Sequence, residues 1–222
     1  MYWADHLEVF PLPQKITVIT ADIVSSRDLG FDQDLLKQKI EAVNSALPEL
    51  LVPFRVSRGD EIQGIMKGWL SSPAILRRLR YYLRPIALRI GIGLGFSDAI
   101  VNSSWDMNGI PFYRAREALD QNKASGAFMT LLKSGQAGID QVANALLILL
   151  DSIRGAWSDE QWEAVHKYEQ LGTYALAGEA IQISAQAVHK RCRHARWDEF
   201  RVGESALAEI GGLLEALSTK ES

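Results

Sequence analysis

The stretch FRVSRGDEIQGIM, Phe54 to Met66, places a Gly59-Asp60 pair between two runs rich in apolar residues. Runs of this kind separated by turn residues predict two strands joined by a tight turn. We expect a strand over residues 54–57, a turn over residues 58–60 and a second strand over residues 61–67. The two acids after the glycine, Asp60 and Glu61, have two interpretations. They are either ordinary turn residues or ligands of a metal and a nucleotide.

The segments around this hairpin alternate between strand and helix patterns. Strands are expected where β-branched and apolar residues follow one another, and helices where apolar residues recur every three or four positions. The resulting order is β-α-β-β-α-β with one more helix and strand, which is a ferredoxin-like arrangement. The other expected strands are residues 15–24, 86–95 and 127–132, and the expected helices are residues 33–47, 74–84 and 112–122.

From Lys133 onward the pattern changes, because every later segment has helical spacing. We therefore predict an α+β chain of two domains. A ferredoxin-like domain spans residues 1–135, and an all-α domain spans residues 136–222 and contains a helix-turn-helix at residues 174–196. The expected helices of the second domain are residues 141–153, 159–171, 174–181, 184–196 and 206–217.

Two carboxylates that are distant in sequence are expected to meet in the first domain. Asp22 ends the first strand and Asp60 lies at the hairpin tip, and these places are neighbours in a ferredoxin-like sheet. Carboxylate oxygens can share Mg²⁺ and leave room for phosphate oxygens. Ser25 and Ser26 lead toward a helix start, where N–H groups can hold a nucleotide phosphate, and Arg58 can contact that phosphate or neutralise the acids. The alternative is that both aspartates are purely structural.

Several motifs of the first domain resemble nucleotide cyclases. ADIVSSR is similar to the metal-binding first strand of class III cyclases, and RGDEI to their hairpin and to the GGDEF signature of diguanylate cyclases. The resemblance implies a nucleotide-cyclase-like fold, a bound nucleoside triphosphate and a site formed by a homodimer. The segment NGIPFYRAREALDQ departs from the cyclase pattern, because Tyr113 and Glu117 stand at the positions of a catalytic asparagine and arginine. Binding could therefore survive while cyclisation is lost.

The whole-chain pattern resembles the SatD family. The motifs that carry this resemblance are ADIVSS, GDEIQG, RIGIGLG and FYRAREAL, followed by a C-terminal helix-turn-helix. The family resemblance covers nearly the full chain and implies the architecture more strongly than any activity.

The segment YALAGEAIQISAQAVHKRCRHA, residues 174–195, has the spacing of a helix-turn-helix. Gly178 is the small residue where two helices cross, and Val188 with Cys192 continues a buried stripe. Ser184 is expected to cap the second helix. The outer face of that helix is polar and basic, which suits contact with bases and phosphates in a major groove. The residues expected to contact DNA are Ser184, Gln186, His189, Lys190 and Arg193.

This segment resembles the helix-turn-helix of sigma-factor region 4 and of LuxR-type regulators. It differs at Gln182, where glycine is usual and where the backbone is expected to be left-handed. The alternative is a plain helical bundle or a dimerisation module, because helix-turn-helix geometry also occurs in proteins that do not bind DNA.

Composition narrows the class of protein. A net charge of −3 excludes a generally basic nucleic-acid coat but allows a local basic face. The single cysteine, Cys192, excludes an internal disulfide framework and suits a reducing cytoplasm. The start MYWADHLEVF does not have the pattern of a signal peptide, and the longest aliphatic run, ALLILL at residues 145–150, is too short to span a bilayer. We expect a cytoplasmic protein with no membrane partner.

Three functions remain open at this point. The first is a transcriptional regulator that binds DNA and whose first domain binds a nucleotide and metal or mediates dimerisation. The second is a Mg²⁺-dependent nucleotidyl or phosphoryl transferase that uses Asp22 and Asp60 as metal ligands. The third is a non-catalytic interaction module.

Overall fold

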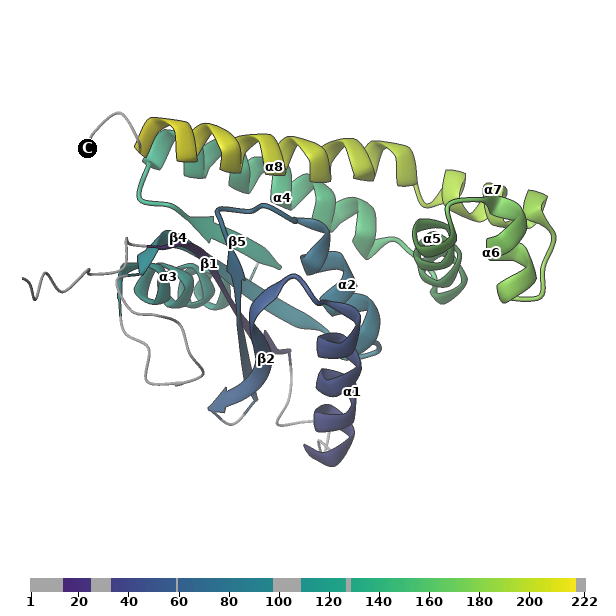
Figure 1. Ribbon diagram of the computed structural model, residues 1–222, viewed down its shortest axis with the longest axis horizontal. Coiled ribbons are helices and arrows are strands. Elements are labelled where there is room, and N and C mark those ends of the chain that lie inside the picture. Colours follow the sequence, from purple (N-terminus) through teal and green to yellow (C-terminus); the bar gives the residue numbers. More distant parts are fainter. Residues whose placement is uncertain (1–13, 25–32, 59, 98–108, 127–128, 219–222) are drawn as a thin grey trace, which may run out of the picture.

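The structure is a computed structural model that describes residues 14–24, 33–58, 60–97, 109–126 and 129–218. It is an α+β protein with one mixed sheet and eight helices in this part of the chain (Figure 1). The strands are β1 (Gln14–Ile23), β2 (Leu50–Arg58), β3 (Glu61–Lys67), β4 (Leu88–Ser97) and β5 (Thr130–Lys133). The helices are α1 (Gln33–Ala46), α2 (Ala74–Leu83), α3 (Ile110–Ser125), α4 (Ala137–Gly155), α5 (Asp159–Leu171), α6 (Tyr174–Ala180), α7 (Ala185–His194) and α8 (Trp197–Ser218).

The five strands lie in the order β2-β3-β1-β4-β5. The pairs β1–β3, β1–β4 and β2–β3 are antiparallel, and β4–β5 is parallel. β1 is therefore a central strand, and its last residues lie between the starts of β3 and β4. The hairpin expected around Gly59 is present as β2 and β3, with Arg58 paired to Glu61.

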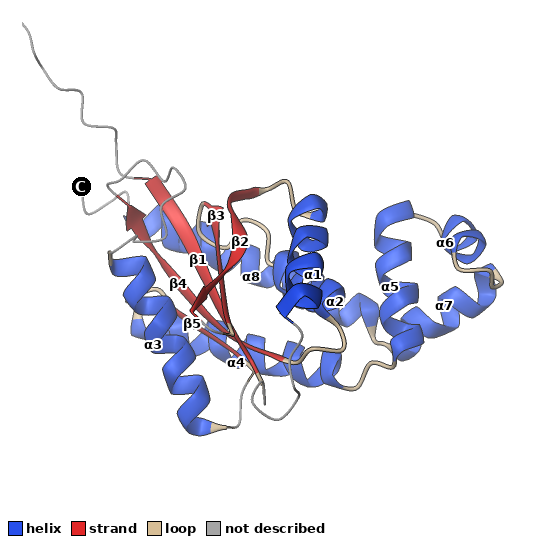
Figure 2. Ribbon diagram, turned by 90° about the horizontal axis from the view of Figure 1, so that it is seen from below, coloured by secondary structure: helices blue, strands red, loops and turns tan. Residues whose placement is uncertain are grey.

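Helices cover both faces of the sheet (Figure 2). α1, α2, α4 and α8 bury one large apolar core with residues of β1, β3, β4 and β5. α3 covers the other face, where a smaller cluster joins Ile16, Val18 and Ile65 to Ala115. Because side chains alternate along a strand, the odd residues of β1 face the large core and the even residues, including Asp22, face α3.

Three glycines at every second position of β4 let α3 lie close to the sheet. A Cβ added at Gly93 would stand 1.9 Å from the Pro111 carbonyl oxygen, and one at Gly91 would stand 2.2 Å from the Ala115 carbonyl oxygen. No side chain larger than hydrogen fits at these distances. The glycines of this strand therefore serve the close approach of two backbones.

The C-terminal half is helical throughout, as expected, but its last helix is longer than the sequence pattern indicated. α8 begins at Trp197 and not at residue 206, because Gly203 does not break the helix but makes room for Leu150 of α4. α8 runs back along α4 over the sheet, while α5, α6 and α7 form a lobe at one end of the molecule (Figure 1). The large core continues from the sheet through both halves. The division into two domains near residue 135 stays a prediction.

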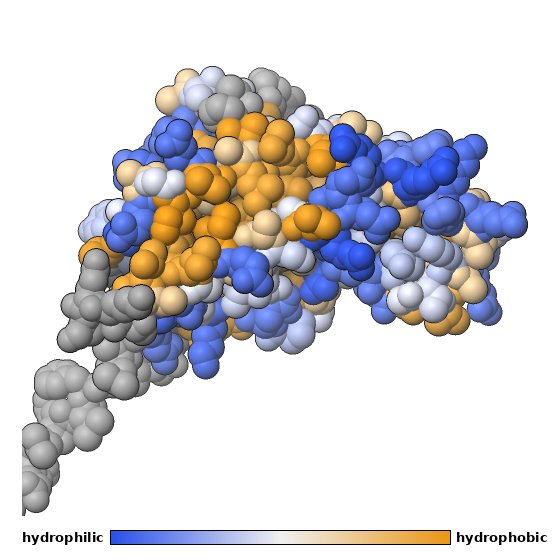
Figure 3. Space-filling model, turned by 90° about the horizontal axis from the view of Figure 1, so that it is seen from above, coloured by the Kyte–Doolittle hydropathy of each residue, from blue (hydrophilic) through white to orange (hydrophobic). Residues whose placement is uncertain are grey.

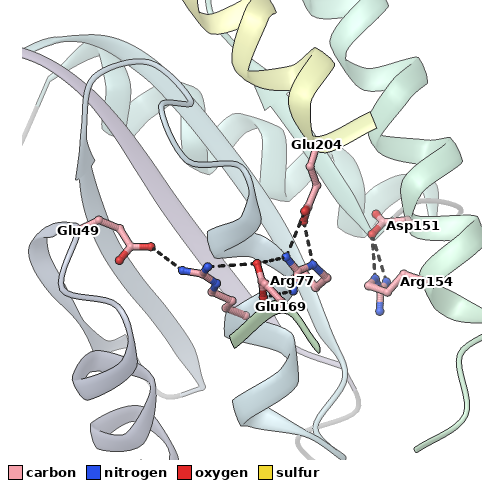
Figure 4. Close-up of polar contacts among 7 residues, drawn as sticks. Glu49, Arg77, Asp151, Arg154, Glu169 and Glu204 are labelled. Atoms are coloured by element: carbon pink, nitrogen blue, oxygen red, sulfur yellow. Dashed lines mark hydrogen bonds and ion pairs between the residues drawn. The ribbon is translucent and has the colours of Figure 1, made fainter. Parts of the chain in front are cut away.

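A buried ionic network joins the halves (Figure 4). Arg77 of α2 donates to Glu169 of α5 at 2.7 and 2.8 Å and to Glu204 of α8 at 3.0 and 3.1 Å. Attraction and hydrogen bonds from the two carboxylates outweigh burial and raise the pKa of Arg77, so this guanidinium stays charged. Within the described part of the chain, every helix is too short or too polar to cross a lipid bilayer.

Candidate functional site

The end of β1 carries the carboxylate of Asp22, and the sheet register decides which residue faces it. Asp22 lies directly opposite Glu61, the first residue of β3. Paired residues of an antiparallel ladder point to the same face, so both side chains are on the α3 side. Asp60 lies in the turn, one residue before this pair. Glu61 is therefore the hairpin carboxylate that is paired with Asp22, and it is only 5% exposed.

α3 supplies a cation to each of these carboxylates. Arg116 and Lys123 are seven residues apart and therefore share one side of the helix. The Lys123 Nζ lies 2.8 Å from Asp22 Oδ1. Arg116 donates to both oxygens of Glu61, at 2.6 Å for its Nη2 and in a second short bond from Nη1. The pair of acids is therefore neutralised within the protein.

A third cation, Arg89 of β4, is also paired with Asp22 in the sheet. Its buried Nε has no hydrogen-bond partner among the residues that the structure describes. The contacts of the cluster are thus the two ion pairs Arg116–Glu61 and Lys123–Asp22, with Arg89 on the same face of the sheet. In the described ranges, no group of three or more His, Cys, Asp or Glu side chains is placed to hold a metal ion. Ser25 and Ser26 and the side chain of Arg58 lie outside the described structure.

The α3 residues at the two decisive cyclase positions face elsewhere. Tyr113 is 67% exposed, and Glu117 forms an ion pair with Lys133 of β5. Arg114 donates to the Leu94 carbonyl oxygen at 2.7 Å, so it supports the backbone of β4. Of the cationic residues in this helix, only Arg116 and Lys123 reach the carboxylate pair in the described structure.

The second candidate site is the helix pair α6–α7, and its turn is built as the sequence predicts. Gly178 accepts close contact, because an added Cβ would lie 2.5 Å from the Ile183 carbonyl oxygen. Gln182 has a φ of 57°, which is the left-handed conformation expected there. The Ser184 hydroxyl accepts a hydrogen bond from the Ala187 N–H at 3.1 Å and so caps α7.

α7 has one buried and one exposed side. Val188 and Cys192 lie in the core, as predicted. Burial raises the pKa of the Cys192 thiol to about 11, so this cysteine is a packing residue and not a reactive thiolate. No acidic residue occurs between Ala185 and Arg196. The exposed residues include all five that were expected to contact DNA, namely Ser184, Gln186, His189, Lys190 and Arg193.

α5 holds this pair in place. Trp162 and Val165 are buried, as expected of a supporting helix, and Trp157, just before it, donates from Nε1 to the Ala195 carbonyl oxygen at 2.7 Å. Tyr174 of α6 stacks on Tyr168 of α5 with ring centroids 4.2 Å apart. The basic face of α7 is therefore presented by a rigid, aromatic-lined support.

Comparisons with known proteins give a family and distant structural likenesses. The crystal structure of a regulator of polyketide synthase expression from Bifidobacterium adolescentis aligns with 95% of this chain and 84% of its own chain, at 10% identity and a TM-score of 0.32. A TM-score of this size carries no argument about fold or function. The search of curated proteins found no match. The family model of the SatD family matches residues 16–195, which include β1, the hairpin, α3 and the α6–α7 pair. The chain therefore belongs to the SatD family.

Proposed function

We propose that this protein is a DNA-binding transcriptional regulator whose α6–α7 pair is a helix-turn-helix. The observation that carries the proposal is the exposed face of α7, which is polar and basic and is set on a capped, tightly turned helix pair. Lys190 and Arg193 form no ion pair with any residue that the structure describes, so both charges are available to phosphates. Gln186 and His189, on the same side, can reach base edges.

A second copy of the chain is the partner we propose, because such helices commonly bind two half-sites as dimers. Apolar side chains gather over α4 and α8 (Figure 3). Two helices of 19 and 22 residues side by side present roughly 600 Å² per copy, or about 1,200 Å² in a symmetric pair, which reaches the lower end of stable interfaces. The large exposed apolar residues of these two helices are Val142, Leu149, Val202, Leu213 and Leu217.

We propose that the N-terminal half is a ferredoxin-like, nucleotide-cyclase-like scaffold without cyclase chemistry. The strand order β2-β3-β1-β4 with antiparallel neighbours supports the fold. The described residues do not fit Mg²⁺ as they are arranged, because Asp22 and Glu61 are each already paired with a cation of α3, which a metal would have to displace. Turnover of ATP or GTP with Mg²⁺ that disappears in Asp22→Asn would overturn this part.

DNA binding is tested with mixed-sequence duplex DNA in a salt titration. Each phosphate contact contributes about −0.9 to the slope of log K against log salt. We expect the Lys190→Ala/Arg193→Ala variant to lose affinity and to have a slope smaller by roughly two. The matched control is Lys37→Ala, which removes an exposed cation from α1, far from α7 in the fold (Figure 1). Equal affinity and slope in wild type and the α7 variant would rule the proposal out.

The dimer is tested by sedimentation of the full chain. We expect wild type to dimerise at micromolar concentration and Leu149→Glu, which places a charge on the apolar face, to sediment as a monomer. The control Leu35→Glu changes an exposed leucine on α1, at 46% exposure against 62% for Leu149, and leaves the α4–α8 face intact. Interfaces of standard size are saturated at concentrations on the order of 100 µM. If wild type stays monomeric at that concentration, the α4–α8 face is not a self-interface.

A further inference from the structure

A cavity of about 260 Å³ lies where the two halves of the molecule meet. Its walls come from the end of α2, the starts of β4 and β5, the end of α4 and the start of α5. It is distinct from the Asp22 cluster, which lies on the opposite, α3 face of the sheet, and from the exposed side of α7. At about 30 Å³ per molecule of liquid water, it is far larger than the site of a single buried water.

Three guanidinium groups line this cavity. Arg80 is only 5% exposed, and its Nε has no hydrogen-bond partner among the residues that the structure describes. Its Nη2 donates to the Met129 carbonyl oxygen at 3.1 Å and to Thr130 Oγ1 at 2.9 Å, which holds the guanidinium in place. Arg84 and Arg154 form the other positive parts of the wall.

The carboxylates nearby do not balance these charges. Asp151 is shared, because it lies 3.1 Å from Arg154 and 3.8 Å from Arg80. Asp159 lies 3.6 Å from Arg84, but its side chain is 91% exposed and is screened by water. Burial and repulsion from Arg154 outweigh Asp151 and lower the pKa of Arg80 to about 9. A further anion would relieve this imbalance.

Flat aromatic groups form another part of the wall. The indoles of Trp157 and Trp162 meet edge to face with centroids 4.8 Å apart, and both line the cavity. Arg84 lies over the rings of Tyr81 and Trp162 at 4.7 and 5.5 Å, and its buried Nε also has no partner within the described residues. Apolar walls with a few convergent polar groups are typical of small-molecule sites.

We propose that this cavity binds a small planar organic anion, with its carboxylate or phosphate held by Arg80 and Arg154 and its ring against the tryptophans. Guanidinium forks suit both kinds of anionic group, and the aromatic wall favours a ring over a bare inorganic ion. Binding of such an anion does not depend on DNA binding, because it involves other residues and its affinity can be measured directly.

The test is calorimetric titration of the full chain with four probes. Benzoate and phenyl phosphate carry the ring and either anion, benzamide is the neutral planar control, and inorganic phosphate has no ring. We expect benzoate or phenyl phosphate to bind at least tenfold more tightly than benzamide and inorganic phosphate, and the better of the two identifies the anionic group. Equal binding of benzamide, or no heat with either aromatic anion, would overturn the proposal.

Variants locate the binding. Arg154→Met keeps the side-chain volume and removes one charge, and we expect it to weaken the preferred probe at least tenfold. Arg201→Met, which removes an exposed cation paired only loosely with Asp198 at 3.8 Å, should leave binding unchanged. Should Arg154→Met fail to fold, Arg84→Gln at the same wall serves instead, and the selectivity of wild type for anions over benzamide still decides the question. Unchanged binding in both wall variants would contradict the assignment.

Discussion

Single atoms decide how the sheet meets α3. The glycines of β4 stand where the backbone of α3 lies, and the site depends on this closeness because α3 delivers Arg116 and Lys123 to the carboxylates. A helix held farther from the sheet would leave Asp22 and Glu61 as buried charges without partners, which is costly. The short contact and the ion pairs are therefore parts of one arrangement.

Gly93→Ala should lower the free energy of unfolding by about 3 kcal/mol or more, because the new methyl group meets backbone atoms that side-chain rotation cannot move. Gly138→Ala in α4 is the matched control, since nothing lies within 4 Å of its added Cβ. That change should be neutral or stabilise by up to about 1 kcal/mol. Urea unfolding of both variants measures the difference, and a Gly93→Ala protein as stable as wild type would contradict the packing described.

His166 makes stability depend on pH. Burial lowers its pKa from 6.5 to about 4, and the ring stacks on Tyr81 with centroids 3.6 Å apart. Between these two pH values the unfolded chain binds the proton and the folded chain does not, so stability falls as the pH is lowered from 6.5 to 4. The loss is about 3 kcal/mol at 1.36 kcal/mol per unit.

The variant His166→Phe keeps the stacked ring and removes the titration. Between pH 6.5 and 4, the free energy of unfolding of this variant should fall by about 3 kcal/mol less than that of wild type. His189→Gln, a change at an exposed histidine, should keep the wild-type dependence. Parallel pH profiles for wild type and His166→Phe would show that another group controls this range.

The bounds of a helix could be predicted from the sequence where neighbouring residues determine them. The bounds of α5, Asp159–Leu171, agree with the sequence pattern, and Ser158 and Gln161 form a capping box that fixes its start. The pattern placed the start of the last helix at residue 206, although α8 begins at Trp197. Packing of Gly203 against Leu150 overrides the low helix propensity of glycine, and no local signal contains this information.

The carboxylate site likewise depends on contacts that a local sequence pattern does not contain. Asp22 was predicted from its place at a strand end, but its partner is set by register, and a shift of one residue exchanges Asp60 for Glu61. The cations come from α3, more than fifty residues further along the chain than the hairpin, and nothing in the hairpin sequence indicates them. In the α6–α7 pair, by contrast, cap, turn and buried stripe are all local, and each was predicted.

The turn before α7 offers a direct test of its left-handed residue. Glycine adopts a φ of 57° without the steric cost that glutamine has, but it also loses more conformational entropy on folding. The first effect is the larger, so Gln182→Gly should stabilise the protein by about 0.5 kcal/mol. Gln186→Gly, inside α7 on the exposed face, should instead destabilise by about 1 kcal/mol. Thermal unfolding compares the two, and a loss of stability in both would contradict the left-handed geometry at Gln182.

At the scale of the whole molecule, ion pairs as well as apolar contacts hold the N-terminal and C-terminal halves together. Arg77 connects α2 to α5, which supports the α6–α7 pair, and to α8, which lies on the same face of the sheet as α2 (Figure 4). Attraction from Arg77 and Arg78 outweighs the effect of burial and lowers the pKa of Glu169 to about 2. Burial dominates at Glu204, whose pKa is raised although it shares the same guanidinium. The two carboxylates thus share Arg77, and Glu169 also has Arg78.

Arg77→Met should destabilise the protein by about 3–5 kcal/mol at pH 7, because Glu204 is left as a buried charge without a cation and the partly buried Glu169 keeps only Arg78. The loss should shrink as the pH is lowered toward 4, since carboxylates without a cation take up protons more readily in the folded than in the unfolded chain. Adding Glu204→Gln should recover part of the loss at pH 7. Arg78→Met, at a pair that is about a third exposed, should cost less than about 1 kcal/mol. If Arg77→Met and Arg78→Met lose equal stability at pH 7, with no recovery at low pH, then apolar packing alone holds α5 and α8 against α2.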